Sequence, residues 1–125
     1  MSSVKLNKMI EKLQLVNLVP EVSTDEIEIS SPEINRPALQ LAGYFEHFAS
    51  ERVQIIGYVE YTYLKSLDRD VKMANYEQFL SSDIPCVIYS TRTEPDEDMI
   101  ELAKKYHKPL LSSHRITSDL MAEVI

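Results

Sequence analysis

The chain has 125 residues, the length of one domain, of which 44% are hydrophobic and 26% charged. This balance is typical of a globular protein and excludes a largely disordered chain. The net charge of −7, with no basic stripe, argues against nucleic acid and against acidic membrane surfaces as partners. We therefore expect a single globular domain over residues 1–125.

The cysteine content and the N-terminus bear on the compartment. The single cysteine, Cys86, excludes an internal disulfide and fits a reducing environment. The N-terminus has no apolar segment of the kind found in signal peptides, and no apolar run reaches the roughly 20 residues that span a bilayer. We expect a cytoplasmic protein.

The first half of the chain predicts one helix and three short strands. Apolar residues at helical spacing indicate the helix, over residues 4–15. Alternating or short apolar runs indicate the strands, at residues 26–30, 39–42 and 53–56. The last two strands are each followed by a glycine, Gly43 and Gly57, where we expect turns that need a positive φ or a close backbone approach.

The second half predicts helices that alternate with strands. Two helices are expected over residues 58–67 and 71–80. The continuous apolar run at 84–89 is typical of a central strand buried on both faces. A helix then opens at residues 93–95 with a proline in its first turn, and its acids at 96–98 and lysines at 104–105 complement the helix dipole. A strand at 109–111 and a final helix over 116–124 complete the chain.

These elements together predict the fold class. Helices that alternate with strands, and a β–α–β unit from residue 84 to 111, indicate an α/β domain. We expect a small mixed, partly parallel sheet flanked by helices.

Several kinds of catalytic or cofactor site have little support. Gly43 and Gly57 are the only glycines, and neither belongs to a GxxxxGK[ST] or GxGxxG phosphate loop. The three histidines lack the spacing of metal ligands, so we expect no metal site. Cys86 lies in an apolar strand, where a small core residue is a simpler interpretation than a nucleophile. We expect no catalytic residue and no cofactor in this chain.

The stretch from residue 35 to 57 contains two candidate ligand or interface residues, Arg36 and Tyr44. It mixes an arginine, a proline and two aromatics in a way that packing alone would not demand. Pro37 holds Arg36 extended, so its guanidinium can bind a carboxylate or phosphate. The alternative is an internal salt bridge, with Glu33, Glu46 or Glu51 as the acid.

A second group of candidates follows the predicted central strand. Arg92 comes just after its carboxyl end, where open α/β sheets bind ligands. Polar side chains follow the next strand, and together with Arg92 they could line a small pocket: Ser112, Ser113 and Thr117. The alternative is that these residues form ordinary caps and turns.

Three blocks resemble a known family, the N-terminal domain of bacterial HPr kinase/phosphorylase. They cover nearly all of the chain, and the first is the most specific. The blocks are NRPALQLAGYF at 35–45 continuing into ERVQIIG at 51–57, IPCVIYSTR at 84–92, and KPLLSS at 108–113 with TSDL at 117–120. Two positions depart from the family pattern: Ala38, where glycine is common, and Asp119, where an arginine or a neutral residue is usual.

The resemblance implies a part in carbon catabolite control. The family is a bifunctional, ATP-dependent serine kinase/phosphorylase that acts on the phosphocarrier protein HPr of the phosphotransferase system. Its N-terminal domain is similar to the first domain of Mur ligases, and no catalytic residue of the family can be carried over to this chain. Catalysis, ATP and Mg²⁺ would belong to a C-terminal kinase domain, on which the family's hexamers are built and which this chain lacks.

Two function hypotheses follow. The first is a non-catalytic regulatory or assembly domain that contacts the kinase domain and neighbouring subunits. The second is a stand-alone sensor that binds a phosphorylated metabolite or nucleotide through Arg36 and Arg92. The sequence ends inside an apolar helical pattern, which favours an excised domain over a stand-alone protein. An independent enzyme, which would have only Cys86 and scattered carboxylates for its chemistry, ranks last.

Overall fold

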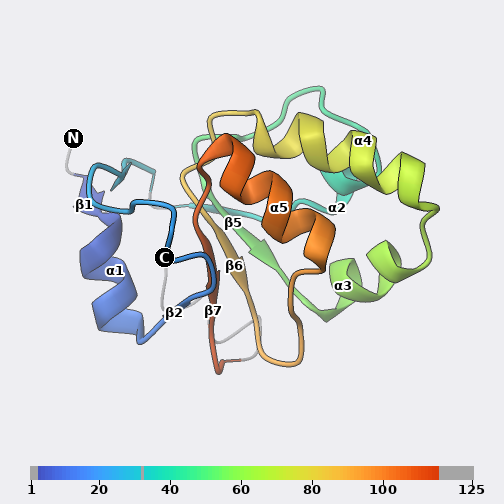
Figure 1. Cartoon of the computed structure of the whole chain (residues 1–125). Helices are drawn as coiled ribbons and strands as arrows, with labels where there is room; N and C mark the ends of the chain where they lie inside the picture. The colour runs from blue at the N-terminus through green and yellow to red at the C-terminus, as the bar shows by residue number, and fades with distance from the viewer. Residues whose placement is uncertain (1–2, 32, 116–125) are drawn as a thin grey trace.

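A five-stranded sheet forms the middle of the molecule (Figure 1). The computed structural model describes residues 3–31 and 33–115. The sheet has the order β2-β7-β6-β5-β4, in which the last four strands are parallel and β2 is antiparallel to β7. The strands are β2 (Val16–Asn17), β4 (Ile34–Asn35), β5 (Val53–Ile56), β6 (Val87–Tyr89) and β7 (Leu110–Ser112). The predicted α/β fold with a mixed, partly parallel sheet is confirmed.

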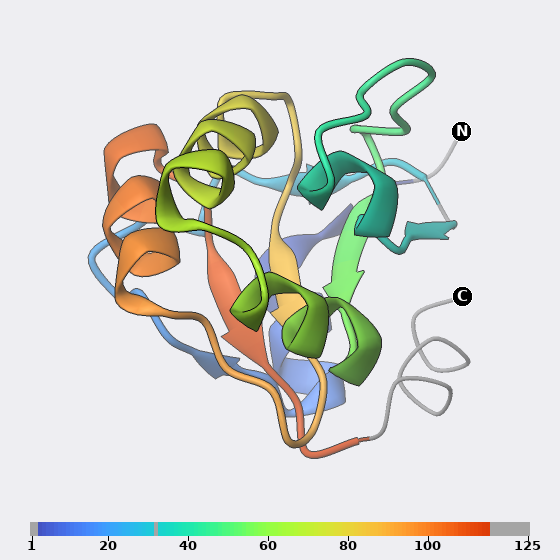
Figure 2. The same cartoon turned by 90° about the vertical axis from the view of Figure 1, so that its right-hand side faces the viewer.

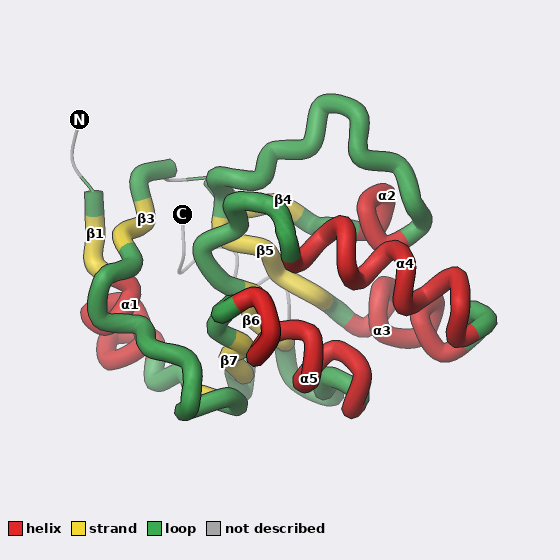
Figure 3. Tube along the Cα trace, turned by 45° about the horizontal axis from the view of Figure 1, so that its top comes forward, coloured by secondary structure: helices red, strands yellow, loops and turns green. Residues whose placement is uncertain are grey.

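Helices cover both faces of this sheet. One face carries α3 (Tyr58–Lys65), α4 (Arg69–Leu80) and α5 (Glu97–Tyr106), with the short α2 (Ala38–Leu41) packed against α3 and α4 (Figure 2). The opposite face carries α1 (Leu6–Leu13) and a two-stranded sheet of β1 (Val4–Lys5) and β3 (Glu28–Ile29), as Figure 3 also shows. Among the described residues, no helix has the length and apolar character needed to cross a membrane.

The central strand β6 shows why both layers are needed. Val87 and Tyr89 pack into the core beneath α3, α4 and α5, whereas Cys86 and Ile88 pack into the core beneath α1. Because successive side chains of a strand point to opposite faces, a continuous apolar run must be covered twice. The prediction of a central strand buried on both faces is confirmed.

The helix α5 confirms the predicted β–α–β unit. Asp96 is its N-cap, and the Asp96 side chain accepts a hydrogen bond from the Met99 amide. Lys104 and Lys105 occupy its last turn, and His107 ends it in the left-handed conformation with φ of 57°. Pro95 precedes the cap instead of lying in the first turn. The helix connects the parallel strands β6 and β7.

The region around residues 34–43 differs from the prediction. The strand predicted at 39–42 is wrong, because these residues fall in and after α2, where the Leu41 amide donates to the Pro37 carbonyl at 2.9 Å. The strand of this region is instead β4, which pairs with β5. An apolar run of four residues has no periodicity that distinguishes helix from strand, and Pro37 favours a helix start.

The two glycines have different roles. Gly43 has a φ of +98° and ends α2, as predicted for a turn of positive φ. Gly57 has a φ of −102° and is the N-cap of α3, so of the two alternatives expected for this glycine, a positive φ does not occur. The final helix predicted over 116–124 lies outside the described residues.

The two-sided burial of the sheet makes a direct prediction about stability. Leu110, in β7, is fully buried, and Leu110→Ala should lower the free energy of unfolding by about 2–5 kcal/mol because it removes packing and leaves a cavity. Leu39→Ala is the matched control: its side chain is 61% exposed, so the change should be under about 0.5 kcal/mol. Urea denaturation of both variants tests this, and equal losses would contradict the burial pattern.

Candidate functional site

The parallel strands bring four loop segments to one edge of the sheet. Arg36 follows β4, Gly57 follows β5, Arg92 lies three residues after β6, and Ser113 follows β7. Because parallel strands end at the same edge, residues far apart in the sequence become neighbours there. We call this the carboxyl edge.

Arg36 makes an internal ion pair at this edge. Its Nη2 lies 2.7 Å from Oε1 of Glu60, a side chain that is only 3% exposed. The same carboxylate oxygen accepts a hydrogen bond from the Gly57 amide at 2.8 Å. Glu60 therefore joins the end of β4 to the start of α3. The Arg36 Nε is buried and has no hydrogen-bond partner among the described residues.

The acid that pairs with Arg36 is not one of the three that the sequence suggested. Glu33 is ion-paired with Arg52 instead, and Glu46 lies beside His47. The signal that points to Glu60 is its place at the third position of α3, where a glutamate side chain can accept from the N-cap amide, here that of Gly57. That signal identifies the helix start but does not identify Arg36 as the partner.

Arg92 is exposed at the same edge. Its backbone has a φ of 66°, and its guanidinium carbon lies 5.2 Å from the centre of the Tyr58 ring, a cation–π arrangement. The neighbouring Thr91 amide donates to the Arg115 carbonyl at 2.9 Å. Arg92 makes no ion pair within the ranges 3–31 and 33–115.

The other predicted site residues are only partly brought together. Ser113 is buried, its amide donates to the Tyr89 carbonyl at 2.9 Å, and its hydroxyl accepts from the Arg115 amide at 3.0 Å. Ser112 is the last residue of β7, beside Ser113. Tyr44 is 47% exposed in the loop after α2, and Thr117 lies outside the described residues.

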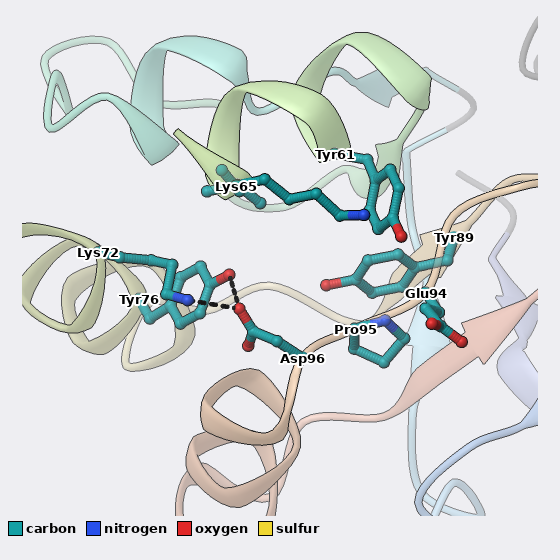
Figure 4. Close-up of a pocket in the computed structure, with 9 residues that line it drawn as sticks. Tyr61, Lys65, Lys72, Tyr76, Tyr89, Glu94, Pro95 and Asp96 are labelled. Carbon is teal, nitrogen blue, oxygen red and sulfur yellow. Dashed lines mark hydrogen bonds and ion pairs between the residues drawn. The ribbon is translucent and has the colours of Figure 1, made fainter. Parts of the chain in front are cut away.

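A cavity of about 270 Å³ opens between α3, α4 and the segment that leads from β6 into α5 (Figure 4). Three tyrosines, two lysines and two acids line it together with a leucine and a proline. They are Tyr61, Leu64, Lys65, Lys72, Tyr76, Tyr89, Glu94, Pro95 and Asp96.

Asp96 organises one wall of this cavity. Its Oδ2 accepts hydrogen bonds from the Lys72 ammonium at 2.8 Å and from the Tyr76 hydroxyl at 3.0 Å. Burial, with smaller contributions from nearby Tyr89 and Asp96, raises the pKa of Tyr76 above its ordinary value. The Tyr76 hydroxyl therefore stays protonated and serves as a donor.

The Tyr89 hydroxyl is different, because it has no hydrogen-bond partner among the described residues. The residue is 2% exposed, and its hydroxyl points toward the cavity side on which Tyr76 and Asp96 lie (Figure 4). Burial raises the pKa of Tyr89 well above its ordinary value. Across the cavity, the Lys65 ammonium lies 4.3 Å from the centre of the Tyr61 ring, and contact with Tyr61 raises the pKa of Lys65.

The cavity residues were not found as a site from the sequence. Tyr61 and Tyr76 have the spacing of buried helix faces, and Tyr89 has the pattern of a buried strand. The lining side chains come from two helices, a strand and a loop, so no local spacing connects them.

Cys86 and the acidic residues offer no catalytic or metal centre in the part of the chain that the structure describes. Cys86 is fully buried, and burial raises the pKa of its thiol to about 12, which removes the thiolate that a nucleophile needs. No three His, Cys, Asp or Glu side chains of the described ranges come together in a way that could hold a metal ion.

Comparison with known proteins gives a consistent family. The model for "HPr Serine kinase N terminus" matches residues 4–125. The HPr kinase/phosphorylase of Lachnoclostridium phytofermentans is 40% identical over 125 residues, which is all of this chain and 40% of that protein. The enzyme of Alkaliphilus metalliredigens is 38% identical, over 100% of this chain and 40% of that protein. The enzyme of Caldicellulosiruptor bescii is 39% identical, over 95% of this chain and 38% of that protein. The chain thus spans about 40% of the length of these relatives.

One similar solved structure contains the CBS and DRTGG domains of the regulatory region of a Clostridium perfringens pyrophosphatase, complexed with its activator diadenosine tetraphosphate. It is 16% identical and superposes with a TM-score of 0.60, covering 98% of this chain and 47% of that one. At this level of identity the likeness concerns the fold.

The Arg36–Glu60 pair predicts a measurable coupling. Arg36→Met and Glu60→Gln should each lower the free energy of unfolding by about 1–3 kcal/mol, because each leaves a poorly hydrated polar group without its partner. The double variant should show a coupling energy above about 1 kcal/mol in a double-mutant cycle.

The exposed pair Lys105–Glu77, at 3.2 Å, is the control, and its cycle of Lys105→Met with Glu77→Gln should give less than about 1 kcal/mol. If the two cycles give equal couplings, Arg36 is not a structural brace.

Proposed function

This chain belongs to the HPr serine kinase N-terminus family, and on that premise we propose that it is the non-catalytic regulatory and assembly domain of an HPr kinase/phosphorylase. The parent enzyme would phosphorylate a serine of HPr with ATP and Mg²⁺, reverse that reaction, and take part in carbon catabolite control. Its kinase domain would belong to the part of the relatives that this chain does not span. That part would also bind HPr and form the hexamer. The chain itself would form one domain over residues 1–125, in a cytoplasmic enzyme.

The observation that carries the assembly role is the outer face of α3. Val59 is 69% exposed and Tyr63 is 39% exposed, one helical turn apart, and Tyr58 at the start of the helix is 52% exposed. We call these three residues the α3 surface. Exposed apolar side chains that gather on one helix are typical of a surface that another protein element covers.

The position of this surface favours the rest of the parent protein as its occupant. The Thr91–Arg115 hydrogen bond holds the last described residue beside the β6–α5 loop, and Arg92 of that loop stacks on Tyr58. Arg115, the last described residue, therefore lies near the α3 surface. A kinase domain that follows in the parent protein is the occupant that we propose for this surface.

The proposal predicts the behaviour of the isolated chain and of a chimera. The pure 125-residue chain, incubated with HPr, ATP and Mg²⁺, should form no phosphoserine, because no catalytic group is expected in it. A chimera in which this chain replaces the matching segment of the L. phytofermentans enzyme should phosphorylate HPr. The double change Val59→Glu with Tyr63→Glu should alter the mass of the assembled chimera or lower its activity at least about fivefold, since charges would enter an apolar contact.

Val4→Glu is the matched control, because Val4 is 48% exposed in β1, on the opposite side of the sheet from α3. It should leave both assembly and activity unchanged. Light scattering and a phosphoserine assay measure the two properties. Phosphoserine formed by the 125-residue chain alone, or an α3-surface variant identical to the Val4 control, would refute the proposal.

A second candidate function is an anion sensor at the carboxyl edge. Arg92 is exposed there, and the buried Arg36 Nε has no hydrogen-bond partner among the described residues. The structurally similar pyrophosphatase region was solved with diadenosine tetraphosphate, which makes this compound the natural first probe. Tyr44, Ser112, Ser113 and Thr117 remain proposed contributors to such a site.

This candidate predicts a melting temperature that depends on Arg92. Diadenosine tetraphosphate at 1 mM should raise the melting temperature of the chain, and Arg92→Ala should abolish the rise because it removes the exposed cation. Arg69→Ala removes another exposed arginine, which pairs with Asp98 of α5, and should preserve the rise. If the melting temperature of the unsubstituted chain does not rise, the anion-sensor function is excluded for this probe.

A further inference from the structure

We propose that the cavity between α3, α4 and the β6–α5 segment binds an uncharged, polyhydroxylated small molecule of about the size of a monosaccharide. This goes beyond the assembly role, because the cavity is distinct from the α3 surface. It also differs from the anion sensor in the class of ligand and in the residues that contact it.

The unpartnered Tyr89 hydroxyl is the first argument. A buried hydroxyl without a hydrogen bond costs free energy, so such groups are normally satisfied by protein, water or ligand. Tyr89 is 2% exposed, its hydroxyl lacks a partner among the described residues, and it points toward the Asp96 wall of the cavity (Figure 4). A ligand oxygen placed there would supply the missing partner.

The balance of charge is the second argument. The lining contains two ammonium groups, Lys65 and Lys72, and two carboxylates, Glu94 and Asp96. A phosphate in this cavity would face both carboxylates, and a cation would face both ammonium groups, so either would meet repulsion as well as attraction. A hydroxyl group can donate to a carboxylate and accept from an ammonium, and this lining offers both.

The size and the remaining walls complete the argument. About 270 Å³ lies just below the roughly 300–1,000 Å³ range of small-molecule sites, which suits a single substituted ring better than a dinucleotide. Leu64, Pro95 and the ring of Tyr61 add apolar surface beside the polar wall of Lys72, Tyr76 and Asp96. A molecule with C–H groups on its faces and hydroxyls around its rim matches both kinds of wall.

The test uses the full 125-residue chain with three uncharged probes, glucose, N-acetylglucosamine and myo-inositol, and with glucose 6-phosphate as a charged comparison. At least one uncharged probe at 10 mM should raise the melting temperature, by about 4–8 °C for a Kd near 1 mM. Glucose 6-phosphate should produce a smaller rise. Calorimetric titration then gives the Kd.

Tyr89→Phe separates ligand binding from a structural role. Without ligand, the melting temperature of this variant should equal or exceed that of the unsubstituted chain, because the change removes a buried hydroxyl that had no partner. Its Kd for the bound probe should be weaker by at least about tenfold, since the ligand would lose its buried hydrogen bond. Tyr63→Phe is the matched control on the α3 surface and should change neither property.

Glu94→Gln tests the charge argument. It gives the lining a net positive charge, so the affinity for glucose 6-phosphate should increase while the affinity for the uncharged probe stays within about twofold.

Three results would overturn the proposal. The first is the absence of any shift with the uncharged probes at up to about 50 mM. The second is a Tyr89→Phe variant that binds the uncharged probe as tightly as the unsubstituted chain does. The third is a Tyr89→Phe variant that melts lower without ligand, which would assign the hydroxyl to a bound water or to another structural contact.

Discussion

The backbone groups of β5 and β6 can be satisfied only inside the sheet, because side chains bury both strands on both faces. All four residues of β5 and all three of β6 are buried, and each strand has parallel partners on its two sides. The rest of the architecture depends on this constraint. It requires a helical layer on each face, and the crossover helices that parallel strands need bring the carboxyl ends of four strands to one edge.

Two carboxylates at the starts of helices hold this edge and its surroundings together. Glu60 accepts from the Gly57 amide and pairs with Arg36, and Asp96 accepts from the Met99 amide and pairs with Lys72. In both cases one acid satisfies its own helix start and also neutralises a basic side chain from another element. The surroundings of the two carboxylates differ. Arg92 is exposed near Glu60, whereas Asp96 faces a cavity in which the Tyr89 hydroxyl has no hydrogen-bond partner among the described residues.

The elements that could be predicted are those whose signal is local. The strand β5 and the helix α5 follow from an apolar run and from a cap with matched terminal charges, and the structure has both. The four-residue helix α2 could not be predicted, because so short an apolar run is equally compatible with a strand. The two-residue strands β1, β2 and β4 were missed for a different reason: pairing with distant residues defines them, and their own composition does not.

The sequence by itself determined the α/β class, the buried central strand and the family, since apolar periodicity, helix-end chemistry and the motif blocks are carried by neighbouring residues. It also placed Arg36 and Arg92 after strand ends. Only the tertiary structure decided that Arg36 pairs with Glu60, 24 residues away, and that Tyr61, Tyr76 and Tyr89 share one cavity. The physical reason is that these contacts join separate elements across the packed layers. Which side chains meet there depends on how strands pair and helices pack, and no spacing along the chain encodes that.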